Sequence, residues 1–257
     1  MSRSGSLVDH RRKAIIDYLT VTGRCRIADL AVRFGVSPLT IRRDLDELEG
    51  QGVVHRSYGI AEIADPLGSP ISSRMVMAKR SIARAAAQLV EDGDTVFVNT
   101  SSTALAVLEH IRAENVTIVT NNGKALQARP SSSISVILTG GEIRLPKWSM
   151  AGEFALDSIS KVSAAKAILG CSGLSAEEGL TTLVSHETSI NALMLERSER
   201  HIIVADSGKL GANSSFCYGS PSQVDTLVTD ASANPSLLES LLDAGVGTMM
   251  RVEVQND

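Results

Sequence analysis

Apolar residues in the N-terminal part of the chain recur at spacings of three and four, the period of an amphipathic helix. This pattern predicts three short helices, and Gly35 provides a tight turn between the second and the third. Helix, short glycine turn and helix form a helix-turn-helix, whose second helix enters the DNA major groove. The apolar positions of the three predicted helices are Ile15, Tyr18 and Leu19; Ile27, Leu30, Ala31 and Phe34; and Ile41, Leu45 and Leu48.

The start of the third predicted helix is specified by its own residues. Ser37 suits the N-cap, because its hydroxyl can accept a hydrogen bond from a free backbone N–H of the first turn. Pro38 then stands at the first helical position, where its missing N–H costs nothing. Val36 and Ile41 occupy the two positions of a hydrophobic staple, which fixes the angle of chain entry.

The outer face of this helix carries hydrogen-bond donors. At about 100° per residue, Leu39 and Arg43 point away from the apolar positions, and Thr40 and Arg42 lie on the flanks. Two adjacent arginines could be a simple solvated face, but the cap, the turn and the local charge all favour DNA binding. We therefore expect DNA contacts from Ser37, Leu39, Thr40, Arg42 and Arg43.

Residues 53–63 alternate well enough between apolar and polar to predict a small β-hairpin, which would form a wing beside the groove. Arg56 and Tyr58 of this hairpin are added to the expected DNA contacts. Residues 1–61 contain ten Lys/Arg and seven Asp/Glu, a net charge of +3, so the whole-chain −4 leaves −7 for residues 62–257. A basic part on an acidic protein is typical of a phosphate-binding module.

The length of 257 residues is sufficient for two domains. The N-terminal residues contain no apolar signal core, and no apolar run approaches the ~18 residues of a membrane span, so we expect a cytoplasmic protein without membrane contact. Cys25, Cys171 and Cys217 match no zinc or redox spacing and are interpreted as reduced thiols. Neither a metal nor a cofactor is expected.

Residues 62–78 combine two prolines, a glycine and several serines, which indicates a linker between domains 1–61 and 79–257. Beyond it, helical segments alternate with short strands whose interiors are almost continuously apolar, as in a parallel sheet covered on both faces. We predict an α/β domain of the doubly wound type. The expected strands lie within residues 94–100, 116–122, 133–141, 165–173, 200–208 and 224–230.

Most of these strands end in small polar residues, and ligands of open α/β sheets bind beyond the carboxyl ends of the strands. The loop at residues 99–103 also begins a helix, so its hydroxyl and N–H groups could hold an anion, with Lys209 adding positive charge. Each cluster alone could simply cap a helix or turn a corner, but five at one end of a sheet favour a ligand site. The expected site residues are Asn99, Thr100, Ser101, Ser102, Thr103, Asn121, Asn122, Gly140, Gly141, Glu187, Asp206 and Lys209.

Two further features allow two interpretations each. Arg144, Lys147 and Trp148 follow a Gly-Gly turn and could belong to a lid or to a solvated loop. Glu187 stands near the start of a predicted helix, where it could be a site carboxylate or a favourable charge for the helix dipole.

The third helix and the hairpin resemble the DNA-binding domain of the DeoR family of bacterial transcriptional regulators, which typically reads Ser/Thr, two residues, then Thr-Ile-Arg-Arg-Asp-Leu. The family's later His-Gly-Gly-Ala is replaced here by Tyr58, Gly59, Ile60 and Ala61. The resemblance continues through "EDGDTVFVNTSST", "VTIVTNN", "ILTGG", "MAGEFAL", "ADSGKLG" and "LVTD", which look like the motifs of the DeoR effector domain.

The resemblance implies a winged helix-turn-helix followed by a sugar-phosphate-isomerase-like α/β domain that senses a phosphorylated sugar or related metabolite. It places the phosphate loop on residues 99–103 and an Asp/Lys motif on Asp206 and Lys209. Asn99 and Ser101 stand where the family has Asp and Gly. Asn99 removes a carboxylate that could accept a sugar hydroxyl or act as a base, and Ser101 disfavours positive φ.

The sequence therefore predicts a regulator, a repressor of a sugar operon, that binds double-stranded operator DNA and a phosphorylated sugar and assembles with itself into a dimer or tetramer. One alternative is a sugar-phosphate isomerase-like enzyme with an appended DNA-binding domain. Another is a constitutive DNA-binding protein whose second domain only oligomerises.

Overall fold

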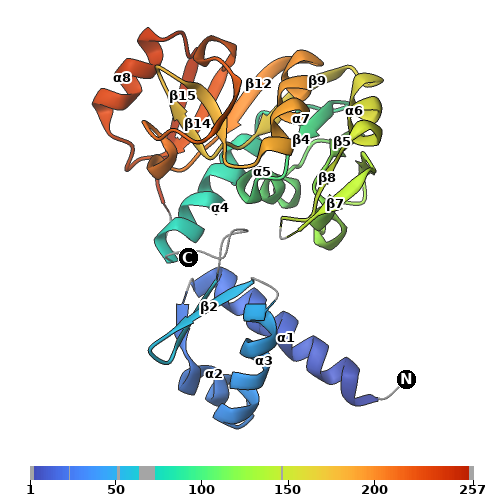
Figure 1. The fold of residues 1–257 in the computed structure, drawn as a ribbon, viewed down its shortest axis with the longest axis vertical. Helices are drawn as coiled ribbons and strands as arrows, with labels where there is room; N and C mark the ends of the chain where they lie inside the picture. Colours follow the sequence, from blue (N-terminus) through green and yellow to red (C-terminus); the bar gives the residue numbers. More distant parts are fainter. Residues whose placement is uncertain (1–2, 23, 51–52, 64–72, 146, 255–257) are drawn as a thin grey trace. The chain divides into compact units, whose positions relative to one another are not determined.

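The computed structural model describes residues 3–22, 24–50, 53–63, 73–145 and 147–254. The chain forms two compact units, Met1–Met77 and Ala78–Asp257. Figure 1 shows the elements of both units. Each unit has hydrophobic core residues of its own.

The N-terminal unit contains the three predicted helices and the predicted hairpin. The helices are α1 (Arg3–Thr22), α2 (Ile27–Phe34) and α3 (Pro38–Gly50). The strands are β1 (Arg24–Arg26), β2 (Val54–Ser57) and β3 (Ile60–Ile63). β3 pairs antiparallel with both β1 and β2. β1 was not predicted, because three residues are too few to show an alternating pattern.

Two turns of this unit depend on left-handed backbone. Gly35 has φ 62° and ends α2, where a glycine avoids the steric cost of a Cβ atom. At the hairpin tip Tyr58 has φ 48° and Gly59 has φ 79°. Two consecutive residues with positive φ are the requirement of a type I′ hairpin turn.

The linker prediction is wrong at its C-terminal end. α4 (Ser73–Ala87) begins inside residues 62–78, because Val76 and Ala78 are buried and continue the apolar side of the helix. The wing ends at Ile63, as the predicted hairpin does, and so passes the domain boundary placed at residue 61. The rest of the predicted linker, residues 64–72, lies outside the described residues.

The second unit is built on a seven-stranded, entirely parallel sheet of order β15-β14-β12-β9-β4-β5-β6. The six predicted strands are confirmed, and the seventh, β15, was missed. The strands are β4 (Thr95–Val98), β5 (Val116–Thr120), β6 (Ile134–Leu138), β9 (Ala164–Leu169), β12 (Ser198–Val204), β14 (Thr226–Asp230) and β15 (Thr248–Val252).

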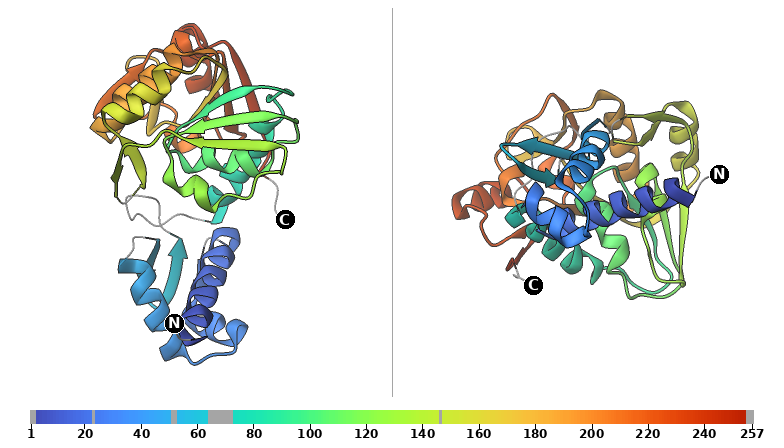
Figure 2. Two further views of the ribbon diagram at one scale, coloured as in Figure 1. Left: turned by 90° about the vertical axis from the view of Figure 1, so that its right-hand side faces the viewer. Right: turned by 90° about the horizontal axis from the view of Figure 1, so that it is seen from below.

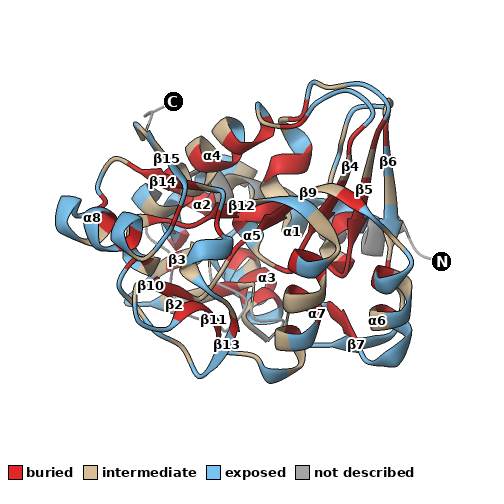
Figure 3. Cartoon of the chain, turned by 90° about the horizontal axis from the view of Figure 1, so that it is seen from above, coloured by how far each residue is buried: buried red, intermediate tan, exposed pale blue. Residues whose placement is uncertain are grey.

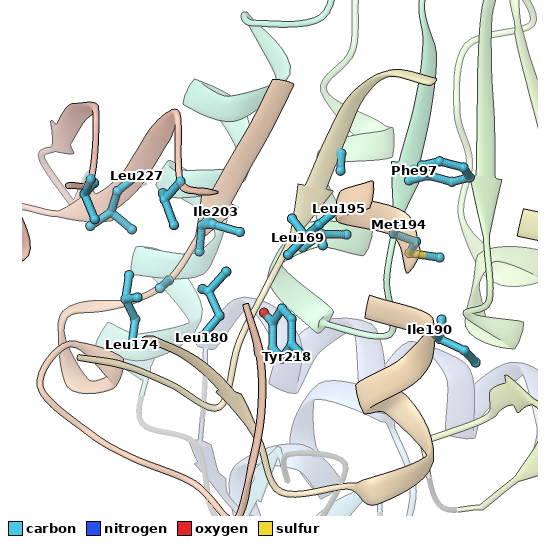
Figure 4. Close-up of a cluster of buried hydrophobic side chains, with 14 of the residues drawn as sticks. Phe97, Leu169, Leu174, Leu180, Ile190, Met194, Leu195, Ile203, Tyr218 and Leu227 are labelled. Atoms are coloured by element: carbon cyan, nitrogen blue, oxygen red, sulfur yellow. The ribbon is translucent and has the colours of Figure 1, made fainter. Parts of the chain in front are cut away.

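Helices cover both faces of this sheet (Figures 2 and 3). Neighbouring side chains of its central strands belong to two different cores. Phe97 packs on one face, with α6 (Glu153–Ser160), α7 (Ser185–Glu196) and α8 (Pro235–Asp243). Its neighbours Val96 and Val98 pack on the other, with α4 and α5 (Ser102–Ala106). Figure 4 shows the first core, to which Leu169 and Ile203 of the sheet and Met194 and Leu195 of α7 all belong.

Shorter elements complete the unit. The helix predicted to begin at the 99–103 loop is α5, which is followed by the 3-10 turn η1 (Val107–Glu109). The other 3-10 turns are η2 (Gly123–Gln127), η3 (Ser207–Lys209) and η4 (Pro221–Gln223). Two small antiparallel sheets are β7 (Glu142–Arg144) with β8 (Ser149–Ala151), and β10 (Gly173–Ser175), β11 (Gly179–Thr182) and β13 (Phe216–Gly219). No helix among the described residues has the length and apolar character to cross a membrane.

Candidate functional site

The start of α3 has the predicted cap. The Thr40 backbone N–H donates to Ser37 Oγ over 3.1 Å, and the two hydroxyl groups lie 2.9 Å apart. Val36 is half-buried against the core to which Ile41 belongs, as a hydrophobic staple requires. The cap therefore fixes the conformation of the first turn of α3.

The outer face of α3 is exposed as predicted. Arg42 and Arg43 are both exposed, and Leu39 keeps 57% of its surface in solvent. An exposed apolar side chain between donors matches the needs of a base edge, since thymine offers a methyl group and guanine offers two acceptors. At the hairpin tip, Tyr58 is fully exposed.

The opposite side of α3 is anchored by an ion pair that sequence reasoning missed. Asp44 is 2% exposed and accepts from Arg11 Nε over 2.6 Å and Arg12 Nε over 3.3 Å. The hydrogen bond to Asp44 raises the pKa of Arg11 above its ordinary value. Both arginines come from α1, so these contacts tie α3 to the rest of the unit.

Arg56 lies in a different environment from the one predicted. Its guanidinium contacts Asp46 and Glu49 of α3, each over 2.6 Å, and its Nη1 donates to the Arg42 carbonyl over 3.4 Å. These contacts join the wing to α3. To bind a DNA phosphate, the Arg56 guanidinium would have to give up one or more of these contacts.

In the second unit, the polar ends of β4 and β5 meet. Asn99 is buried and makes two hydrogen bonds to the Gly170 backbone, and its Nδ2 also lies 3.2 Å from Asn191 Oδ1. Asn122 Nδ2 donates to the Asn99 carbonyl over 3.5 Å. The amide of Asn99 is therefore a bridge from the sheet to α7.

The expectation that Ser101 opposes a positive φ does not apply in this structure. Ser101 has φ −63° and is the N-cap of α5, where its Oγ accepts from Ala104 N over 3.4 Å. A Cβ at Gly170 would lie 2.0 Å from the Ser101 hydroxyl, so the serine requires a glycine across from it. Ser102 is exposed and Thr103 is buried.

Glu187 is a buried carboxylate with four contacts. Only 3% of it is exposed. Its carboxylate accepts hydrogen bonds from Thr100 Oγ1 over 2.7 Å and from Thr182 Oγ1 over 3.0 Å. Lys147 Nζ donates to both carboxylate oxygens, over 3.1 Å and 3.0 Å. Glu187 is therefore more than a favourable charge for the helix dipole, because its carboxylate joins the 99–103 loop to the segment between β7 and β8.

The residues of that segment differ in whether they agree with a lid or with a solvated loop. Lys147 keeps only 16% of its side chain exposed and is bound to Glu187, which agrees with a lid residue. Arg144 is exposed and pairs with Glu142 on the same strand, and Trp148 is exposed with φ 59°. Only Lys147 of the three contacts the expected site.

Gly140, Gly141, Asp206 and Lys209 make no hydrogen bond to the network around Asn99 and Glu187. Gly140 and Gly141 have φ 71° and 102° and lead from β6 into β7. Asp206 is buried before η3, and the Lys209 side chain makes no hydrogen bond or ion pair with any described residue. Burial raises the pKa of the Cys171 thiol to about 12, with the charges of Lys209 and Asp206 acting on it in opposite directions. The Asp206–Lys209 loop therefore lies near the end of β9.

Family comparisons identify both units. Residues 11–66 match the family described as DeoR-like helix-turn-helix domain, and residues 74–231 match the DeoR C terminal sensor domain. The chain belongs to the DeoR family. This confirms the resemblance seen in the motifs of both units.

Among relatives of this DeoR-family chain is the glycerol-3-phosphate regulon repressor of Escherichia coli K12, 34% identical over 91% of this chain and 95% of the relative. The HTH-type transcriptional repressor GlcR of Bacillus subtilis is 29% identical over 93% and 94%. The lactose phosphotransferase system repressor of Streptococcus mutans is 29% identical over 89% and 94%.

Similar solved structures include ribose 5-phosphate isomerase A from Methanocaldococcus jannaschii, with 15% identity and a TM-score of 0.36 over 51% of this chain and 52% of that chain. Another is eIF2B beta from Chaetomium thermophilum, with 16% identity and a TM-score of 0.43 over 67% and 55%.

Three residues of the sensor unit were missed by sequence reasoning: Thr182, Asn191 and Lys124. Thr182 and Asn191 bond to predicted site residues, whereas Lys124 stands in η2, directly after the predicted Asn122. A signal existed only for Lys124, which is a cation two residues beyond a strand-end cluster. Within the described residues, no group of three or more His, Cys, Asp or Glu side chains is placed to hold a metal ion.

Proposed function

We propose that this DeoR-family regulator is a repressor of a sugar or carbohydrate operon, and that a phosphorylated sugar or related anionic metabolite controls its binding to operator DNA. The observation that carries the DNA-binding part is the outer face of α3, with Leu39, Arg42 and Arg43 exposed on a capped and anchored helix. The relatives whose names mention glycerol 3-phosphate and lactose support a carbohydrate pathway.

The control by a metabolite is supported by the polar network at the carboxyl ends of the strands. α5 has only five residues and its dipole is the sum of few peptide units, so anion binding there needs side-chain cations as well. Lys209 was the predicted cation, and it has no counter-ion among the described residues. Effector contacts from residues 99–103, Asn121, Asn122, Glu187 and the Asp206–Lys209 loop remain part of the proposal.

An isomerase is the weaker candidate. Isomerisation needs a positioned base and acid, and the buried carboxylate of Glu187 already accepts from two threonines and a lysine. Asn99, in place of a carboxylate, cannot accept a proton. We therefore propose a regulator that is not an enzyme, and turnover assays with ribose 5-phosphate and other sugar phosphates test this directly.

Dimers of helix-turn-helix proteins bind two half-sites one helical turn apart, so we also propose a homodimer or tetramer assembled through the second unit. As a regulator of chromosomal genes it would act in the cytoplasm. Sedimentation at micromolar concentration, with and without DNA, tests the assembly, and a monomer in both cases contradicts it.

The experiment for the main proposal has two stages. DNA sequences bound by the full-length protein are selected from a random pool, and the selected duplex is titrated with and without a panel of sugar phosphates. We expect one preferred sequence and at least one metabolite that weakens binding. The coupling should be ~1–3 kcal/mol, the usual range. Sequence-independent binding, or a preferred duplex that no metabolite affects, contradicts the corresponding part.

A further inference from the structure

A second lysine lies beside the segment that carries Lys147. η2 begins at Gly123 directly after the Asn122 cap, and Gly123 N donates to the Trp148 carbonyl over 2.8 Å. A bridge between Asn122 and Ser149 continues this contact. Lys124 is therefore attached to the same β7–β8 segment as Lys147, although the two are far apart in the sequence.

The two ammonium groups are unequal in their surroundings. Lys147 has its counter-ion in Glu187, 3.0 Å away. Lys124 is half-buried, and its ammonium group makes no hydrogen bond or ion pair with another described side chain. Burial, and then the charge of Lys147, lower the pKa of Lys124. Partial burial of a cation without a counter-ion is costly, and an anion placed beside it would offset this cost.

The local charge also favours an anion. Lys124 and Lys147 contribute two positive charges, and Glu187 contributes one negative charge. The carboxylate would repel an anion, but its oxygens are occupied by Thr100, Thr182 and Lys147.

A polar atom without a partner lies in the same strand-end cluster. Asn121 is fully buried at the end of β5, next to the Asn122 cap, and its Oδ1 has no hydrogen-bond partner. Its Nδ2 donates to the Met150 carbonyl of β8 over 3.2 Å, which holds the amide against the β7–β8 segment. Buried acceptors are normally paired, so this oxygen indicates a donor, such as a ligand hydroxyl, that the chain itself does not supply.

We propose that Lys124 is the residue that selects an anionic effector, binding its phosphate group together with Lys147, while Glu187 holds Lys147 in position. The inference rests on the proposed metabolite control and specifies the chemistry of that site. Thr100 connects it to the 99–103 loop, because its hydroxyl donates to the same Glu187 carboxylate that binds Lys147. The ligand is thus a phosphomonoester carrying hydroxyl groups.

The decisive variant is Lys124→Met, because it removes the charge with little change in length and breaks no contact that the structure shows. Lys124→Arg keeps the charge and serves as the rescue variant. Lys161→Met is the matched control, since Lys161 is an exposed lysine of the same unit. Lys147→Met is less informative, because it also leaves the buried Glu187 without its cation.

Binding is measured on the full-length protein by calorimetry and thermal shift. The ligands are inorganic phosphate, glycerol 3-phosphate, ribose 5-phosphate, and unphosphorylated glycerol and ribose, each at matched ionic strength. We expect Lys124→Met to lose about tenfold in affinity for the phosphorylated ligands, as for a lost charge-assisted hydrogen bond. Lys124→Arg should lose less, and Lys161→Met should equal the wild type.

Two results overturn the inference. One is equal binding of phosphorylated ligands by wild type and Lys124→Met, and the other is no binding of any phosphorylated ligand, inorganic phosphate included, by the wild type. Wild-type binding of inorganic phosphate alone still supports the anion site, provided that Lys124→Met weakens it. Failure of metabolite control is a separate result: if phosphorylated ligands bind through Lys124 but leave DNA affinity unchanged, the proposed control is wrong and the anion site remains.

Discussion

The side chain of Asn99 pairs with the backbone of Gly170 in both directions. Nδ2 donates to the Gly170 carbonyl over 2.9 Å, and Oδ1 accepts from the Gly170 N–H over 3.1 Å. A side-chain amide offers both a donor and an acceptor, whereas an ionised carboxylate offers acceptors alone. The asparagine at this position therefore has a structural role that an ionised carboxylate cannot take.

We predict that Asn99→Asp destabilises the second unit. The change removes the donor to Gly170 and places a buried negative charge against its carbonyl oxygen. The cost should be about 1–3 kcal/mol in the free energy of unfolding, the usual penalty for an unpaired buried polar group. Urea denaturation measures it, with the exposed Asn213→Asp as control. A stability equal to wild type would show that the amide can be replaced.

We predict that Arg43→Ala and Arg42→Ala affect DNA binding differently. Arg43 points away from the core, so its loss should cost about 1–3 kcal/mol at the preferred sequence and relax selection at one base pair. Arg42 lies on the flank, so its loss should weaken all sequences alike and flatten the dependence on salt. Gel-shift titrations at several salt concentrations measure both. Unchanged binding by the double variant would remove α3 from the DNA interface.

We predict that Asp44→Asn weakens the N-terminal unit and, through it, DNA binding. The neutral amide leaves Arg11 and Arg12 without the buried carboxylate that anchors α3 to α1. We expect a loss of about 1–3 kcal/mol in stability, with weaker binding to every sequence, because Asp44 faces away from DNA. Denaturation and gel shifts measure the two effects. A change in base preference instead of general weakening contradicts the anchoring role.

How much the sequence could predict depends on the separation of the interacting residues. Ser37, Pro38 and Ile41 specify the start of α3 within one turn, so the helix and its exposed face were predicted correctly. The network around Glu187 could not be predicted, because Thr100 is 87 residues away from it. Asn99 and Asn191 are separated by 92 residues, and no local pattern records such a contact.

The errors in element boundaries have similar causes. Residues 73–78 were included in the predicted linker although its prolines and glycine all lie before residue 71. Val76 and Ala78 are buried, and this burial extends α4 through them. β15 was missed because this edge strand has no fully buried position and lacks the apolar run of a central strand. The DNA contact of Arg56 was predicted from its place in the wing and stays a prediction, but its ion pairs with Asp46 and Glu49 of α3 are contacts that the sequence did not indicate.

We predict that Ser102→Ala and Lys209→Ala retain DNA affinity but reduce the effect of the metabolite. Ser102 is exposed in the 99–103 loop, so its hydroxyl can reach a ligand without unfolding, and Lys209 adds a cation near the end of β9. Operator binding in the presence of the active metabolite measures the effect. A response equal to wild type in both variants would mean that the ligand does not contact this loop, while a loss in Lys124→Met alone would place it entirely by η2.

The last prediction concerns acid stability and His186. Its Nε2 lies 2.9 Å from the hydroxyl of the buried Ser149. Burial lowers the pKa of His186 from its ordinary 6.5; the charge of Glu187 opposes this shift, and those of Arg144 and Lys147 add to it. The unfolded chain therefore binds a proton at a higher pH than the folded one. Stability should fall as the pH drops below about 6.5, the ordinary pKa of histidine. This fall should end when the pH reaches the lowered pKa of His186 in the folded state. Melting temperatures of wild type and His186→Gln between pH 7.5 and 5 measure this, and the variant should lose less on acidification because it has no proton to gain at this position. Parallel curves for the two proteins would show that His186 takes up its proton equally well folded and unfolded.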